Sequence, residues 1–369
     1  MLLSKETLER GIVRLGNNYR LKKLFDRAKA GESLTIGFLG GSITQGSVAS
    51  DEKLCYAYRT FEWFEKTFPK ASFKYVNAGI GGTTSQFGVS RADRDLLSAD
   101  PDFVVIEFSV NDSNDPLFKE TYEGLVRKVF RYRSEPAVVV LHNVCYDTGV
   151  NAEEVHLPTG EYYSIPAASV KWGEYADIEK GLIKREDITP DMLHPNDLGH
   201  GMLAEQLTFL LEKELEAKDT DEEFAFPKEP LTQNRFEHAD RILNDGEANL
   251  SGFEKDLSPK QASWDHFHNG WTAVKPGDKI SFELDAAVIA VQYRKTPELP
   301  AIKAVCVLDG NKTAPVVLDG AFDETWGDCL FCETVLNDKK PEKHTIEITV
   351  TEAPEGFVKP FYLLSVLYA

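Results

Sequence analysis

The residues Ser42, Asp191 and His194 have the side chains that nucleophilic catalysis needs. Ser42 follows two glycines, Gly40 and Gly41, which let the backbone turn sharply and present both the hydroxyl and its own N–H to a substrate. A histidine can act as a base near neutral pH. Asp191 precedes His194 by three residues and can reach one ring nitrogen while the other faces Ser42. This combination predicts a nucleophile, a base and an orienting carboxylate.

Two further turns could supply hydrogen-bond donors to a developing negative charge. The segment at residues 77–85 (NAGIGGTTS) lies between an expected strand and an expected helix, so its exposed backbone N–H groups can face an anion. Asn111, in the segment SVND, offers a side-chain N–H directly after another expected strand. Each feature alone is also typical of an ordinary tight turn. Residues 40–44 match neither GxGxxG nor GxxxxGK[ST], so they do not indicate a phosphate-binding loop.

Strands and helices alternate over the first 215 residues and must position these turns. Short apolar runs bounded by turn residues, typical of strands buried on both faces, occur at residues 34–39, 73–76, 103–108 and 137–141. Helices are expected at residues 56–68, 84–97, 121–132 and 198–215. Asn196 or Asp197 is the expected N-cap of the last helix. The alternation predicts a three-layer α/β/α domain with a mainly parallel sheet.

An acidic stretch with prolines, at residues 217–230, separates the alternating strand and helix patterns from a region of strand patterns. Strand-like segments separated by Gly and Asp turns follow, at residues 279–291, 304–308, 315–318, 330–335 and 344–350. We therefore expect two domains, an α/β domain at residues 1–220 and an all-β sandwich at residues 231–369.

The composition and the charge limit which binding partners and which cellular location we expect. The chain has 369 residues, with 41 Lys and Arg against 60 Asp and Glu, so its formal net charge is −19. Such a surface repels nucleic acid and anionic lipid, and no apolar run reaches the roughly 18 residues of a membrane span. The opening MLLSKETLERGIVRLGNNYR does not read as a signal peptide, so we expect a cytoplasmic protein. Cys329 and Cys332 form a CxxC without a second ligand pair, so we expect packing cysteines and no metal site.

Taken together, these segments resemble the sequence blocks of the SGNH (GDSL-like) hydrolase superfamily over roughly residues 30–215. GGSIT resembles the serine block, with Gly-Gly-Ser where many members have Gly-Asp-Ser, and DMLH resembles the block that supplies Asp and His. IGGTTS and SVND resemble the blocks that supply a glycine and an asparagine to the oxyanion hole. Ser109 departs from the family pattern, in which glycine is more frequent at this position.

The resemblance implies an esterase that forms an acyl-enzyme and needs no metal or organic cofactor. It implies a catalytic triad of Ser42, Asp191 and His194. It also implies an oxyanion hole made of the N–H of Ser42, the N–H of Gly82 and the side-chain amide of Asn111.

The C-terminal half is similar to the jelly-roll modules joined to some carbohydrate esterases, and the order of the two domains resembles carbohydrate esterase family 17. This resemblance implies a serine esterase that removes O-acetyl groups from plant-derived oligosaccharides, first among them manno-oligosaccharides. The alternatives are an acetylxylan esterase, a broad short-chain esterase or lipase with the same triad, and a carbohydrate-binding protein without activity. The β domain could bind substrate, close the site or support a homodimer.

Aromatic residues are the candidates for sugar binding, because a tryptophan on a loop can stack on a pyranose ring. Trp326, with polar neighbours, is the strongest of three tryptophans in turn-rich parts of the β half, the others being Trp264 and Trp271. A tryptophan is more often a core residue. His142 and Trp172 are further candidates to line the cleft.

Overall fold

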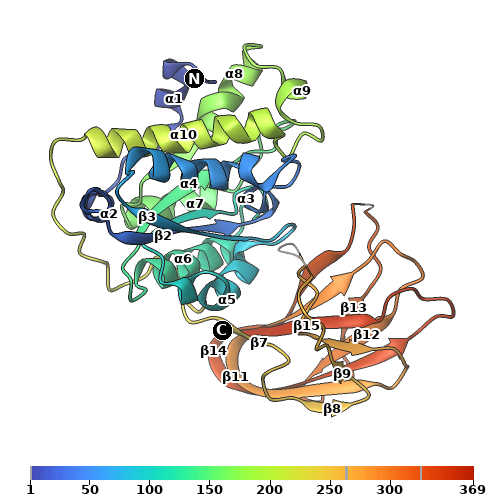
Figure 1. Cartoon of the computed structure of the whole chain (residues 1–369). Coiled ribbons are helices and arrows are strands. Elements are labelled where there is room, and N and C mark those ends of the chain that lie inside the picture. The colour runs from blue at the N-terminus through green and yellow to red at the C-terminus, as the bar shows by residue number, and fades with distance from the viewer. Residues whose placement is uncertain (1, 262–264, 325) are drawn as a thin grey trace. The chain divides into compact units, whose positions relative to one another are not determined.

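The computed structural model describes residues 2–261, 265–324 and 326–369, and the chain divides into two compact units, Met1–Glu237 and His238–Ala369 (Figure 1). The division falls later than the expected start of the second domain at residue 231, because the preceding segment is bound to helix α6 (Pro116–Phe130). The backbone N–H groups of Leu231 and Thr232 donate to Glu123 at 2.6 and 2.8 Å. Glu237 forms a buried ion pair with Arg127 at 2.7 Å. Residues 231–237 therefore belong to the first unit.

The first unit is built on a six-stranded sheet with the strand order β1-β6-β5-β4-β2-β3. The strands are β1 (Ile12–Arg14), β2 (Ser33–Gly40), β3 (Ser72–Gly79), β4 (Phe103–Glu107), β5 (Ala137–His142) and β6 (Ala167–Ser169). β2 to β6 pair in parallel, and β1 runs antiparallel to β6. Every residue of β4 and β5 is buried, as parallel strands covered on both faces require. The expectation of a mainly parallel sheet is confirmed.

Helices cover both faces of this sheet, with α4 and α10 on one side and α5 and α6 on the other (Figure 1). Besides α6, the helices are α1 (Lys5–Arg10), α2 (Tyr19–Ala30), α3 (Ser42–Gln45), α4 (Tyr56–Thr67), α5 (Ser85–Asp95), α7 (Glu153–Tyr162), α8 (Ala176–Glu179), α9 (Arg185–Ile188) and α10 (Asp197–Glu216). Leu24 of α2, Phe64 of α4 and Leu207 of α10 share one buried core with Val105 of β4. The three-layer α/β/α architecture is confirmed.

Side-chain caps fix where two of these helices begin. The Asn196 side chain accepts hydrogen bonds from the N–H groups of Leu198 and Gly199 at 3.0 and 3.1 Å, so Asn196 is the N-cap of α10. Asp115 caps α6 in the same way, with a proline at the first helical position. The cap of α10 fixes the chain two residues after His194.

The second unit is an antiparallel sheet with the order β13-β12-β14-β11-β15-β10-β9, to which β7 and β8 pair through β15 and β11. Its strands are β7 (Asp240–Ile242), β8 (Asn249–Ser251), β9 (Glu254–Lys255), β10 (Trp271–Ala273), β11 (Lys279–Lys295), β12 (Lys303–Leu308), β13 (Val316–Asp319), β14 (Cys329–Glu352) and β15 (Phe361–Tyr368). The expected strands at 330–335 and 344–350 are parts of one strand, β14, which pairs with β11 on both sides of an irregularity at residues 338–341. Irregularities in register near Ala286 and Ile289 let the two long strands bend.

No helix of the described ranges is both long and apolar enough to cross a membrane. All five cysteines carry free thiols, and Cys55, Cys306 and Cys329 are buried. Within the described residues, no group of three or more His, Cys, Asp and Glu side chains is arranged to hold a metal ion.

Candidate active site

Three neighbouring strands end at the same level of the first sheet. Gly40, the last residue of β2, is the register partner of Gly79 in β3 and of Glu107 in β4. Ligand sites of parallel sheets lie at the carboxyl ends of the strands. The segments that follow these three ends carry the predicted site residues Ser42, Gly82 and Asn111.

The structure brings the three predicted triad residues together. Ser42 is the first residue of α3 and is 6% exposed. Nε2 of His194 lies 2.8 Å from Oγ of Ser42, although the two residues are 152 positions apart. Nδ1 of His194 lies 2.7 Å from Oδ2 of Asp191. These distances are those of direct hydrogen bonds, so a proton can pass from the serine to the imidazole.

Asp191 is held so that its carboxylate remains ionised. Its Oδ1 accepts hydrogen bonds from the backbone N–H groups of His194 and Leu193, at 2.7 and 3.0 Å. Partial burial acts to raise the pKa of Asp191, but the hydrogen bonds from the His194 ring and from these two N–H groups outweigh it and lower that pKa. An ionised carboxylate at Nδ1 places the imidazole proton on Nδ1 and leaves Nε2 free to accept the Ser42 proton.

The turn that contains Gly82 lies against the nucleophile. A Cβ built on Gly81 would lie 3.5 Å from Cβ of Ser42, which is ordinary contact distance. The N–H of Gly81 donates to Oε1 of Gln45 at 2.6 Å and is therefore occupied. Gly82 follows with a φ of 68°, in the left-handed region that favours glycine. No motif in the sequence indicated that Gln45, the last residue of α3, supports this turn.

Asn111 lies against the glycine that precedes the nucleophile. A Cβ on Gly41 would lie 2.1 Å from Oδ1 of Asn111, so residue 41 must be glycine for the amide to keep this position. The structure thus brings Asn111 together with the Ser42 segment. Its side-chain amide carries an N–H of the kind that stabilises an oxyanion, and its oxyanion role stays a prediction.

A buried carboxyl, Glu107, lies beneath these loops and was not predicted. It accepts hydrogen bonds from the backbone N–H and the hydroxyl of Ser109, at 3.1 and 3.2 Å, and lies 3.4 Å from Oγ1 of Thr44. Burial raises the pKa of Glu107 to about 7. The Ser109 hydroxyl also lies 3.1 Å from the carbonyl oxygen of Asn143, so this serine makes contacts that a glycine could not make. The one available signal was an acidic residue inside the apolar run FVVIEF.

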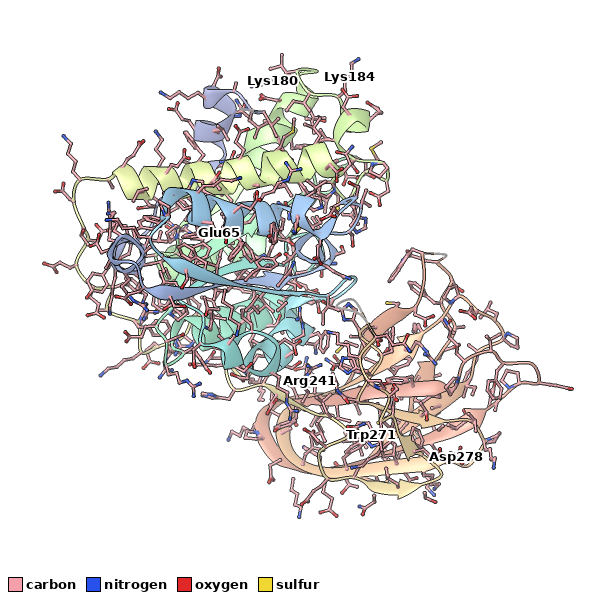
Figure 2. All side chains as sticks on the ribbon, viewed as in Figure 1. Glu65, Lys180, Lys184, Arg241, Trp271 and Asp278 are labelled. Carbon is pink, nitrogen blue, oxygen red and sulfur yellow. The ribbon has the colours of Figure 1, made fainter. Side chains whose placement is uncertain are left out.

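Two predicted substrate-binding residues are wrong because they are buried. Trp271 is 0% exposed and packs edge-on against Phe282 in the core of the second unit (Figure 2). His142, at the end of β5, is 2% exposed, so its ring has no surface for a sugar. Burial lowers the pKa of His142 well below its usual value, so the ring is neutral.

Two of the other predicted substrate-binding residues are exposed on the surface. Trp326 is 56% exposed, with its ring edge-on to Phe322 and its indole N–H donating to Glu324 at 2.8 Å. Trp172 is 43% exposed on the helical turn Lys171–Tyr175. Both stay predictions as sugar contacts. Trp264 lies outside the described residues.

Comparison with known proteins agrees with this geometry. Residues 38–202 match the GDSL-like Lipase/Acylhydrolase family. The chain is similar to a crystal structure of a two-domain esterase active on acetylated mannans, with 49% identity and a TM-score of 0.96 over 98% of each chain. It is equally similar to that kind of esterase co-crystallized with mannopentaose, at 49% identity and a TM-score of 0.94, over 98% of this chain and 97% of the other. No curated protein sequence matches the chain.

The matched family region spans the serine loop, both oxyanion segments and the loop of Asp191 and His194. The full-length similarity extends over both units at an identity well above the level at which only a fold is shared. The chain therefore belongs to the GDSL-like hydrolases, as an ester hydrolase of the two-domain esterase type.

Proposed function

We propose that the enzyme removes O-acetyl groups from manno-oligosaccharides by way of an acyl-enzyme on Ser42. The observation that carries the mechanism is the continuous chain of hydrogen bonds from Ser42 through His194 to Asp191. The choice of substrate is supported by the 49% identical esterase, which is active on acetylated mannans. A neutral sugar ester also suits a chain of net charge −19 better than an anionic lipid or thioester.

The first half of the reaction forms the acyl-enzyme. Nε2 of His194 takes the proton of Ser42 as Oγ attacks the acetyl carbonyl, and Asp191 stabilises the imidazolium. The negative oxygen of the tetrahedral intermediate accepts hydrogen bonds from the N–H of Ser42, the N–H of Gly82 and the side-chain amide of Asn111. Each donor contributes on the order of 10²–10³ in turnover.

The tetrahedral intermediate then collapses to complete the acyl-enzyme, and hydrolysis returns the enzyme to its starting state. The imidazolium of His194 gives its proton to the sugar oxygen, the C–O bond of the ester breaks, and the deacetylated sugar leaves. His194 then removes a proton from a water molecule as the water oxygen attacks the acetyl-serine. The bond between the acyl carbon and Oγ breaks, Oγ of Ser42 takes the proton back from His194, and acetate leaves. In this scheme the chain's own side chains carry every proton.

The test is NMR of acetylated manno-oligosaccharides and xylo-oligosaccharides before and after treatment, because it reports the sugar and the position of each lost acetyl group. Parallel assays with 4-nitrophenyl acetate, butyrate and octanoate measure the acyl-chain limit. The proposal expects faster loss of acetyl groups from the mannose substrate and a decline from acetate to octanoate. Faster deacetylation of xylose would favour an acetylxylan esterase, and a preference for octanoate would favour a lipase.

A further inference from the structure

Asp112, the residue after the oxyanion donor Asn111, has a buried side chain with both oxygens bonded. Its Oδ1 accepts a hydrogen bond from the backbone N–H of Ser85 at 2.8 Å. Its Oδ2 lies 2.9 Å from Nε2 of His156. The carboxylate is 0% exposed, so it depends on these partners in place of water.

The bond to Ser85 connects the two loops of the oxyanion hole. Ser85 is the first residue of α5, three residues after Gly82. The N-cap residue of α5, Thr84, makes no side-chain cap bond. Asp112 supplies a cap from another part of the chain, and a carboxylate is favoured at the positive end of a helix. One side chain therefore holds both the segment of Asn111 and the segment that follows Gly82.

His156 holds the other oxygen of this carboxylate. It lies on α7, its side chain is 1% exposed, and its ring stacks on Tyr122 with the centroids 3.7 Å apart and the planes 9° from parallel. A carboxylate has no proton to donate, so the Nε2–H of His156 is the donor to Oδ2. The stacked ring directs this N–H at the carboxylate.

We propose that His156 is a positioning residue for the oxyanion hole, acting through Asp112 on Asn111 and on the turn of Gly82. The inference rests on the acyl-enzyme mechanism proposed above. Without the Nε2–H, one carboxylate oxygen is buried and unpaired, and the carboxylate must turn toward another donor. Asn111 and the start of α5 then move with it. Because the oxyanion exists only in the transition state and the intermediate, the loss falls on kcat and spares KM.

Two substitutions separate the hydrogen bond from the packing. His156→Phe keeps an aromatic ring against Tyr122 and removes the N–H. His156→Gln keeps an N–H of similar reach and removes the stacked ring. We expect His156→Phe to lower kcat by about 10- to 100-fold, as a misplacement of about 1 Å can cost 10²-fold, with KM within about twofold. We expect His156→Gln to restore most of that loss.

The assay is hydrolysis of 4-nitrophenyl acetate by the full chain, with thermal unfolding of each variant measured in parallel. Wild-type kcat in a folded His156→Phe variant would overturn the inference, as would equal losses in both variants. If His156→Phe does not fold, Asp112→Asn serves instead. The asparagine oxygen can still accept from the N–H of Ser85, but its NH₂ group would face the Nε2–H of His156, so that two donors meet without an acceptor. We expect kcat to fall, and an unchanged kcat would overturn the inference. An inactive wild-type enzyme would contradict the proposed function and is therefore a separate result.

Discussion

Replacing Gly41 by alanine perturbs the oxyanion hole without removing a donor. The new Cβ would lie 2.1 Å from Oδ1 and 3.0 Å from Cγ of Asn111, whereas ordinary contact begins at 3.4 Å. The Asn111 amide must therefore retreat by about 1.3 Å, the difference between 3.4 and 2.1 Å. The backbone of residue 41 has a φ of −86°, outside the left-handed region that favours glycine.

The displaced group is the end of a side chain, so it can rotate away at limited cost to the fold. Catalysis is more sensitive, because a misplacement of about 1 Å can cost on the order of 10²-fold. We expect Gly41→Ala to lower kcat by about 10²-fold with little change in KM, since the lost contact is made to the oxyanion and not to the ground-state ester.

The assay is hydrolysis of 4-nitrophenyl acetate in a double-mutant cycle with Asn111→Ala, supported by thermal unfolding of each variant. Asn111→Ala alone should lose about 10²–10³ in kcat. If Gly41→Ala acts by displacing Asn111, the double variant should be no slower than Asn111→Ala. Wild-type turnover in Gly41→Ala, or losses that multiply in the double variant, would refute the reasoning.

Two further substitutions test the base and the buried carboxyl. Asp191→Asn keeps an oxygen for the backbone N–H groups but turns an NH₂ toward Nδ1 of His194, so we expect kcat to fall by about 10³–10⁴ in a folded protein, measured by steady-state kinetics. Glu107 has its pKa raised to about 7 by burial, so the stability it contributes is present below about pH 4.5 and is lost as the pH rises through 7. Glutamine does not titrate, so Glu107→Gln should not lose this stability as the pH rises. We therefore expect the free energy of unfolding of the variant, relative to wild type, to be higher at about pH 8 than at about pH 5, by up to about 3 kcal/mol. Urea unfolding at both pH values measures this, and parallel pH profiles for the two proteins would contradict it.

The grouping of Ser42 and Asn111 at one sheet edge could be predicted because it depends on topology. Parallel strands deliver their following loops to one sheet edge, so a serine after β2 meets an asparagine after β4 in any sheet of this order. The loop of His194 was recognisable by its Asp-x-x-His spacing and by the cap at Asn196.

The groups that support the site could not be predicted, because they depend on contacts between side chains of different elements. Glu107 reads as a strand residue, and nothing near His156 in the sequence points to Asp112. Trp271 had the turn-rich neighbours of a loop residue but begins β10 in the core. The expected strands at 330–335 and 344–350 were separate segments, yet the structure joins them in β14, which pairs with β11 on both sides of residues 338–341. The homodimer and the cytoplasmic location stay predictions.

The central claim is that Ser42 is the nucleophile. The most direct measurement is acetate release from acetylated manno-oligosaccharides by Ser42→Ala, with wild-type folding verified by thermal unfolding. We predict a loss on the order of 10⁴- to 10⁶-fold, because His194 and Asp191 then lack the serine oxygen from which His194 takes the proton. Acetate release by folded Ser42→Ala at the wild-type rate would contradict the account.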